Sequence, residues 1–205
     1  MNKVQILLFY YNRPRLVREA LASIRESTCK NWELAIIDDG SDIPIENILV
    51  DCFSNEDLMA TKVYSSGHTK ADKEAQGGSM FGKFVNQAME ESNADICFML
   101  CDDDVITPWY TEQLDFFYSQ NPEVMYSYCD VVTMDSSVDF WREKIKGPAS
   151  DHFLNSNHNP HNMCNSKDAS QGSWRMSCIK EGGLRFPYPR TAALDAALWE
   201  DLNRL

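Results

Sequence analysis

The sequence predicts an α/β fold, with one domain built on a mostly parallel central sheet that has helices on both faces. Apolar runs that suit strands alternate along the chain with segments whose apolar residues recur at helical spacing, and this alternation is typical of parallel sheets. The 205 residues fit about one domain, and neither a repeat nor a Pro/Gly/Ser-rich linker divides them. We therefore expect a single domain over residues 1–205.

The chain begins with a strand, a helix and a second strand. Residues Val4–Tyr10 are almost all apolar, as in strands that are covered on both faces. Pro14 suits the first turn of a helix, and the residues after it continue with helical spacing. Residues Trp32–Ile37 form a second apolar run that leads into a turn sequence at Asp38, and residues 62–64 predict a third, short strand.

The same alternation continues through the middle of the chain. An apolar stripe from Phe81 to Met89 predicts a helix, and residues 95–101 form the next apolar strand. A further helix is expected from Pro108, and residues 124–133 alternate like a strand.

The pattern is weaker in the last third. Residues 135–171 show little periodicity and predict a long loop, which serves as a lid or binding segment in some domains and is simply mobile in others. Helices are expected over residues 173–181, ended by Gly182 and Gly183, and from Thr191 onward. Because the chain stops inside the second of these helices, the sequence could be a fragment of a longer multidomain protein.

The charge and hydropathy of the chain argue against two classes of partner. Lys and Arg number 19 against 31 Asp and Glu, which gives a net charge of −12. Binding to nucleic acid or to an anionic membrane depends on clustered Lys and Arg, which this sequence lacks. The longest apolar run is far shorter than the ~20 residues that span a bilayer. We expect a soluble, cytoplasmic protein without a nucleic-acid partner or a transmembrane segment.

The seven cysteines are irregularly spaced and include no CxxC pair. This pattern predicts neither a zinc site nor a disulfide framework. Reduced thiols of this kind are typical of cytosolic proteins.

Three consecutive aspartates, Asp102, Asp103 and Asp104, follow the apolar run at residues 95–101. Carboxylates this close raise one another's pKa unless a cation neutralises them. Their oxygens suit Mg²⁺ or Mn²⁺, ions that keep coordination positions for water and substrate phosphates. Consecutive side chains point to different sides, so at most two of the three are expected to contact one ion. The alternative is a solvated acidic turn or a helix cap before Pro108.

A second acidic turn, Asp38-Asp39-Gly40-Ser41, follows the second strand, and Tyr10-Tyr11-Asn12 follows the first. Ligands of parallel sheets bind outside the carboxyl ends of the strands, so all three segments are expected at one edge. An aromatic ring there could stack on a flat heterocycle while a neighbouring carboxylate accepts from a ring N–H. The alternatives are an Asx-type turn for the aspartates and core packing for the tyrosines.

Several common catalytic and cofactor motifs are absent from the sequence. Neither GxGxxG nor GxxxxGK[ST] occurs, which disfavours the standard dinucleotide and ATP sites. No GxSxG is present, so Ser-His-Asp hydrolysis has little support. Some basic side chains are candidates either for a ligand role or for a solvated surface: Lys70, Lys73 and Lys83 for phosphate, and His152, His158 and His161 for a metal shell.

Three groups of segments resemble those of one known family. The opening group is Phe9-Tyr10-Tyr11-Asn12-Arg13, Leu21–Ile24, and Trp32–Leu34 leading into Asp38–Ser41. The middle group is Val85–Ala88, Ala94–Ile96 and Leu100–Asp104 with Pro108 four residues on; the last is Gln171–Met176, Gly182–Phe186 and Leu194–Trp199. With a gap over residues 135–170, the chain resembles family 2 glycosyltransferases with the GT-A fold along nearly its whole length.

The resemblance implies a GT-A (Rossmann-like) domain whose residues 1–104 bind a nucleotide-sugar donor and whose residues 105–205 bind an acceptor. It implies that Tyr11 stacks on or flanks the nucleotide base, that Asp39 contacts the base, and that Asp38 is a nearby support.

The resemblance also assigns the acidic run to the family's DXD motif. Cys101 falls where the first acid of that motif often sits, which leaves Asp103 as the implied metal ligand and Asp104 as its assistant. Asp102 would then face the ribose or a metal-bound water. Asp195 aligns with the catalytic base of the inverting members, and Glu200 and Asp201 are its rivals one turn later.

Residues and resemblance together predict a glycosyltransferase of the hexosyl or deoxyhexosyl class. It would move a sugar from a nucleoside-diphosphate sugar, with UDP favoured, to a hydroxyl of a glycan or other acceptor, using Mn²⁺ or Mg²⁺. Inversion with Asp195 as base is expected, and retention stays open. The alternatives are a non-catalytic nucleotide-sugar-binding domain, a metal-dependent nucleotidyltransferase, and a phosphotransfer module that uses Asp38 or Asp102.

Overall fold

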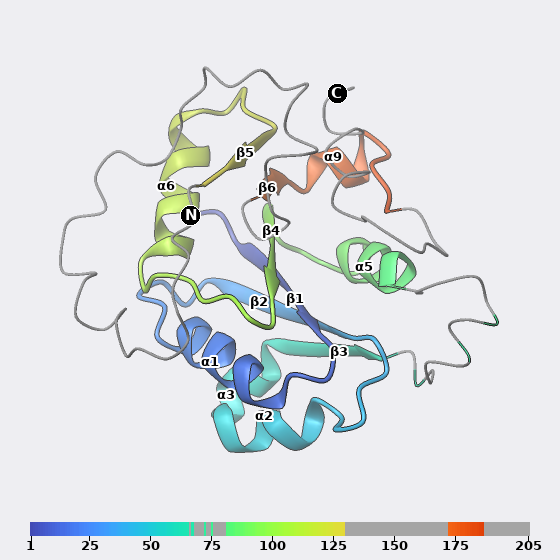
Figure 1. The fold of residues 1–205 in the computed structure, drawn as a ribbon. Helices are drawn as coiled ribbons and strands as arrows, with labels where there is room; N and C mark the ends of the chain where they lie inside the picture. Colours follow the sequence, from blue (N-terminus) through green and yellow to red (C-terminus); the bar gives the residue numbers. More distant parts are fainter. Residues whose placement is uncertain (66, 68–71, 73–74, 76–80, 130–171, 187–205) are drawn as a thin grey trace.

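A computed structural model of the protein describes residues 1–65, 67, 72, 75, 81–129 and 172–186 (Figure 1). Its helices and strands follow one another as β1 (Val4–Tyr10), α1 (Pro14–Arg25), β2 (Trp32–Asp38), α2 (Glu46–Cys52), α3 (Asn55–Met59), β3 (Thr61–Ser65), α5 (Phe81–Glu90), β4 (Ile96–Cys101), α6 (Tyr110–Gln120), β5 (Tyr126–Tyr128), β6 (Gly172–Arg175) and α9 (Ser177–Lys180).

The strands form one six-stranded sheet in the order β3-β2-β1-β4-β6-β5. β1 lies between β2 and β4 and pairs with both in parallel, and β2 pairs in parallel with β3. β6 runs antiparallel to its neighbours β4 and β5. The prediction of a mostly parallel sheet is therefore confirmed for the part of the chain that the structure describes.

Helices cover both faces of this sheet, as Figure 1 shows. Alternate residues of the central strands point to opposite faces, so Ile6 and Leu8 pack in one core cluster and Leu7 in the other. The first cluster includes residues of α1, α2 and α6, and the second includes residues of α5 and α9. Burial on both faces explains why β1 is apolar at almost every position.

Helices α1, α5 and α6 begin close to where the sequence pattern places them. Pro14 occupies the first turn of α1, where its missing N–H costs no helical hydrogen bond, and Val17, Leu21 and Ile24 are buried on one side. The helix that was expected from Pro108 begins at Tyr110. Among the helices of the described residues, none is long and apolar enough to cross a membrane.

The expectation of a single helix over residues 173–181 is wrong. Residues Gly172–Arg175 form strand β6, and only Ser177–Lys180 are helical. Trp174 is fully buried between β4 and β5, pairing with Cys97 on one side and Tyr126 on the other. Pairing with two distant strands stabilises the extended conformation, and a local apolar pattern does not report it. The predictions for residues 130–133, for the loop at 135–171 and for a helix from Thr191 lie outside the described residues.

Two hydrogen bonds between the Asn86 side chain and the Phe186 backbone join helix α5 to the segment after α9. The Asn86 side-chain amide donates to the Phe186 carbonyl at 2.8 Å, and the Phe186 N–H donates to Asn86 Oδ1 at 2.8 Å. Both residues are buried, and they are 100 positions apart in the chain. The contact therefore holds the described carboxyl-terminal segment against helix α5.

Replacing Asn86 by leucine is expected to lower the free energy of unfolding by about 2–6 kcal/mol, because two buried backbone groups of Phe186 lose their partner and each costs about 1–3 kcal/mol. Urea denaturation measures this change. Gln87→Leu on the exposed side of the same helix is the matched control and is expected to change stability by less than about 0.5 kcal/mol. Equal effects of the two substitutions would contradict this role for Asn86.

Candidate functional site

The carboxyl ends of β1, β2 and β4 lie side by side at one edge of the sheet. Tyr10 of β1 is level with Asp38 of β2, and Phe9 is level with Cys101 of β4. The Asp39 N–H donates to the Tyr10 carbonyl at 3.2 Å just beyond the strands. The tyrosine segment and both acidic turns therefore meet at this edge, as the sequence predicts.

Asp102 joins the end of β4 to the loop that follows β1. Its carboxylate accepts from the Tyr11 N–H at 2.9 Å and from the Arg13 guanidinium at 3.0 Å. The residue is only 5% exposed, and burial raises the pKa of its carboxyl, while the bonds from Tyr11 and Arg13 oppose that rise. Asp102 thus holds Tyr11 beside the acidic turn through the Tyr11 backbone. Tyr11 is 43% exposed, in contrast to Tyr10, which is buried in the core.

Arg13 contacts two aspartates of the acidic turn with one nitrogen. Its Nη1 lies 3.0 Å from Asp102 Oδ1 and 2.6 Å from Asp103 Oδ2. Sequence reasoning gave Arg13 no role at the site, because these partners are 89 and 90 positions away in the chain. The available signal was a basic residue just past a strand end, at the edge where the aspartates were already expected.

Asp38 and Asp39 differ in their surroundings. Asp38 is buried, and its carboxylate accepts from the N–H groups of Ser41 at 2.9 Å and Ile45 at 3.2 Å. These bonds close the turn after β2, in which Gly40 takes a φ of 80° that suits glycine. Asp38 therefore shapes the turn that carries Asp39, and Asp39 is only half-buried.

The loops after β1 and β2 are tied together by Asn12. Its N–H donates to Ser41 Oγ at 3.1 Å, and its Oδ1 accepts from the Asp42 N–H at 2.8 Å. Asn12 has a φ of 53°, a left-handed conformation that asparagine tolerates better than most residues. This strained position fixes the direction in which the chain carries Tyr11 and Arg13 past the edge.

Cys101, Asp103 and Asp104 place one possible ligand atom each within 4.8 Å of one another. Asp103 is exposed, whereas Cys101 and Asp104 are half-buried. The two carboxylates are hard oxygen ligands of the kind that Mg²⁺ and Mn²⁺ prefer, and the thiol is the softer member of the group. The residues present therefore fit a divalent cation held chiefly by Asp103 and Asp104. The resemblance had placed Cys101 at the first position of the DXD motif, and the structure brings its thiol into the same group.

Lys83 lies in the first turn of α5, close to the same edge. The ring of Phe81 at the start of this helix lies 4.4 Å from the ring of Phe9 near the end of β1. The Lys83 ammonium lies 5.7 Å from the centre of the Phe84 ring. The other candidates, namely Asp195, Glu200, Asp201, Lys70, Lys73, His152, His158 and His161, lie outside the described residues.

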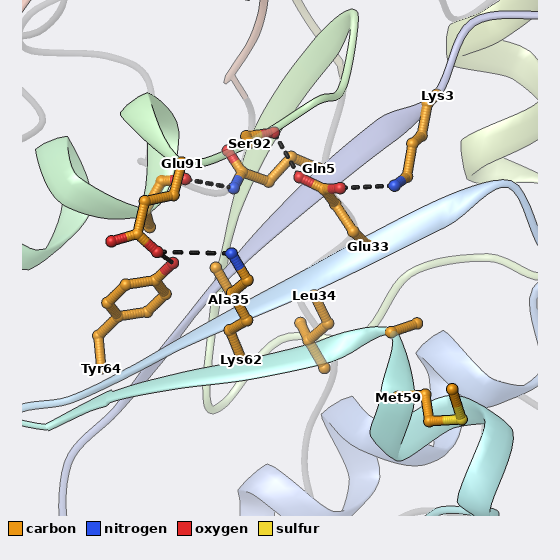
Figure 2. Close-up of a pocket in the computed structure, with 12 residues that line it drawn as sticks. Lys3, Gln5, Glu33, Leu34, Ala35, Met59, Lys62, Tyr64, Glu91 and Ser92 are labelled. Atoms are coloured by element: carbon orange, nitrogen blue, oxygen red, sulfur yellow. Dashed lines mark hydrogen bonds and ion pairs between the residues drawn. The ribbon is translucent and has the colours of Figure 1, made fainter.

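A cavity of about 130 Å³ lies at the opposite edge, near the amino ends of β1, β2 and β3 (Figure 2). Its charged side chains pair with one another: Lys3 with Glu33 at 2.6 Å, and Lys62 with Glu91 at 3.4 Å. Glu91 also accepts from the Tyr64 hydroxyl at 2.9 Å, and its hydrogen bonds, from Gln87 first, hold the pKa of its carboxyl below the ordinary value. Charges that neutralise one another indicate a structural network in this cavity.

The comparisons with known proteins identify a family and a shared fold. A family model described as Glycosyl transferase family 2 matches residues 6–176. S. aureus TarS 1-349 in complex with UDP-GlcNAc matches with a TM-score of 0.71 at 16% identity, covering 97% of this chain and 52% of that chain. The same protein in complex with UDP matches with a TM-score of 0.70 at 16% identity, covering 96% of this chain and 54% of that chain.

A third solved structure is the mannosyltransferase PcManGT from Pyrobaculum calidifontis in complex with GDP-Man and Mn²⁺. Its TM-score is 0.61 at 14% identity, and the match covers 95% of this chain and 50% of that one. The chain thus spans about half the length of the solved proteins it matches. At such identities the likeness shows the fold.

Proposed function

Because the chain belongs to glycosyl transferase family 2 and has the GT-A fold, we propose that it transfers a sugar from a nucleoside-diphosphate sugar to an acceptor hydroxyl. The observation that carries the proposal is the 2.9 Å bond from the Tyr11 N–H to Asp102. This bond holds the Tyr11 backbone beside a run of carboxylates, at the edge where parallel sheets bind ligands. An aromatic surface for a base and carboxylates for a cation are the two features that a nucleotide sugar requires.

The donor would lie across the ends of β1, β2 and β4. The Tyr11 ring would stack on the base, and Asp39 would accept a hydrogen bond from it. Asp38 would act indirectly, since its carboxylate already accepts two backbone N–H groups and so positions Asp39. Asp102 would orient Tyr11 and face the ribose. Lys83 is the proposed phosphate contact from α5, and a UDP-sugar is the proposed donor.

Asp103 and Asp104 would hold Mn²⁺ or Mg²⁺ beside the diphosphate, with Cys101 next to them. When bound, the ion would neutralise the negative charge that develops on the departing diphosphate. The carboxylates would fix the donor so that the sugar carbon faces the acceptor side. PcManGT, which was solved with GDP-Man and Mn²⁺, supports this arrangement by its fold.

The proposed general base is Asp195, which would take the proton of the acceptor hydroxyl on the sugar face opposite the diphosphate. Displacement from that face inverts the configuration of the sugar carbon. This assignment rests on the resemblance of residues Leu194–Trp199 to the acceptor-side segment of the family. In this sequence the rival acids Glu200 and Asp201 follow directly after Trp199.

Thermal unfolding with a panel of UDP-, GDP-, dTDP- and CMP-sugars, each with and without Mn²⁺, tests the proposal. A ligand present at about 100 times its Kd adds about 2.7 kcal/mol and raises the Tm of a chain this size by about 5–10 °C. We expect the largest rise with UDP-sugars and Mn²⁺ together. The absence of a shift with every nucleotide sugar would contradict the proposal. Release of pyrophosphate from a nucleoside triphosphate would instead indicate a nucleotidyltransferase, and binding without release of the diphosphate a non-catalytic domain.

A further inference from the structure

We propose that Arg13 couples cation binding to donor binding, by making the acidic turn a poor site for a divalent cation until a diphosphate is present. The inference rests on the proposed function and adds to it a residue that controls when the cation binds. It is carried by the contacts of the Arg13 guanidinium with Asp102 and Asp103.

Arg13 is held at the turn by a buried partner. The Asp102 side chain is 6% exposed, and its Oδ1 lies 3.0 Å from Arg13 Nη1, a charge-assisted contact in a partly dehydrated place. The Tyr11 N–H occupies the other oxygen of the same carboxylate. The buried carboxylate of Asp102 thus fixes the Arg13 guanidinium in place, while half of the Arg13 side chain remains exposed.

From this anchor, Arg13 reaches the aspartate that is the best candidate to hold the cation. The same nitrogen lies 2.6 Å from Asp103 Oδ2, and Asp103 shares the cluster within 4.8 Å with Asp104 and Cys101. A cation bound by Asp103 would therefore have the guanidinium as a close neighbour on the same carboxylate. Arg13 and the cation compete for the negative charge of that carboxylate.

The sign of the effect follows from charge. Two unit charges about 4 Å apart interact by about 1 kcal/mol even in water, and a divalent ion doubles that figure. Arg13 also holds the Asp103 side chain in one orientation, which by itself would favour cation binding. This contribution is smaller than the repulsion, because an aspartate side chain has few rotamers to lose. Removing the positive charge should thus strengthen binding of the bare cation. A donor diphosphate offsets the repulsion, since its own negative charge interacts favourably with both cations.

The test is a titration of the protein with Mn²⁺, followed by electron paramagnetic resonance of the free ion, with and without UDP. The variants are Arg13→Gln and Arg13→Met, which remove the charge, and Arg13→Lys, which keeps it. Arg18→Gln is the matched control, because Arg18 of α1 forms a comparable exposed ion pair with Asp51 of α2 at 3.0 Å. Two neutral variants keep the test decisive if one of them folds poorly.

We expect Arg13→Gln and Arg13→Met to bind Mn²⁺ alone roughly tenfold more tightly than the wild type. By linkage, the factor by which UDP strengthens Mn²⁺ binding should fall to about the same extent. Arg13→Lys and Arg18→Gln should stay within about threefold of the wild type, and added salt should shrink the effect because it screens exposed charges.

Unchanged or weaker Mn²⁺ binding in both neutral variants would overturn the inference while leaving the proposed function intact, provided that the wild type binds Mn²⁺ with UDP. A wild type that binds no Mn²⁺ even with UDP would overturn both the inference and the metal dependence of the proposed function.

Discussion

Asp103→Ala is expected to remove the metal-dependent part of nucleotide-sugar binding, weakening donor affinity in the presence of Mn²⁺ by about 100-fold or more. Loss of a residue that merely supports a metal ligand costs about 10–100-fold in metal affinity, and Asp103 is proposed as a ligand itself. The fold should remain intact, because the Asp103 side chain is 45% exposed at the end of a turn. Calorimetric titration with a UDP-sugar, with and without Mn²⁺, measures the difference.

Asp51→Ala is the matched control for this variant. Asp51 is also an exposed aspartate, and it pairs with Arg18 at 3.0 Å on another part of the surface. Both substitutions therefore break one exposed aspartate–arginine pair, and only Asp103→Ala touches the candidate metal group. If Asp103→Ala kept the full metal-dependent affinity, the assignment of Asp103 would be wrong.

Asp195→Asn is expected to lower the rate of sugar transfer by about 10²–10⁴-fold, the usual contribution of a positioned general base. Donor affinity should be nearly unchanged, since Asp195 is proposed to act on the acceptor. The asparagine keeps the shape of the side chain and removes its ability to take a proton. Release of UDP under saturating donor measures the rate, and calorimetry measures the affinity.

The rival acids supply the controls for Asp195. Glu200→Gln and Asp201→Asn should each retain transfer within a few-fold of the wild type. Near-normal turnover in Asp195→Asn together with a large loss in one of these two variants would move the base to that residue.

Much of the fold could be predicted from local patterns. β1, β2 and β4 were recognised because strands buried on both faces are apolar throughout, and α1, α5 and α6 because one face of each is buried. The helices α2 and α3 were not predicted, since they have only 7 and 5 residues, too few to show a helical period. A capping box between Ser54 and Asp57 was the local signal for α3.

The strand β6 shows the limit of such patterns. Its four residues are extended because they pair with β4 and β5, which lie far away in the sequence. Nothing within residues 172–175 alone distinguishes this strand from the first turn of a helix. Pairing between distant segments decides the structure there.

Some features of the candidate site could be predicted from the sequence, and others could not. The sequence predicted that Asp38, Asp39 and Asp102 to Asp104 share one edge, because each acidic turn directly follows a strand of a parallel sheet. It raised an Asx-type turn as the alternative role of the aspartates, and Asp38 does close its turn by accepting from the N–H groups of Ser41 and Ile45. It did not predict that Arg13 contacts Asp102 and Asp103, because that depends on which distant side chains the fold brings together.

The central claim is that a nucleotide diphosphate and a cation bind together at the carboxyl edge of the sheet. Paramagnetic broadening by Mn²⁺ in ¹H–¹⁵N spectra of the labelled protein with UDP tests it most directly, because β1, at 7 residues, is about 20 Å long and separates the two edges. The account predicts that the amides of Tyr11, Asp39 and Asp103 broaden first, while Lys3 and Glu33 at the opposite edge keep their signals. Broadening centred on Lys3 and Glu33, or none with UDP present, would contradict it.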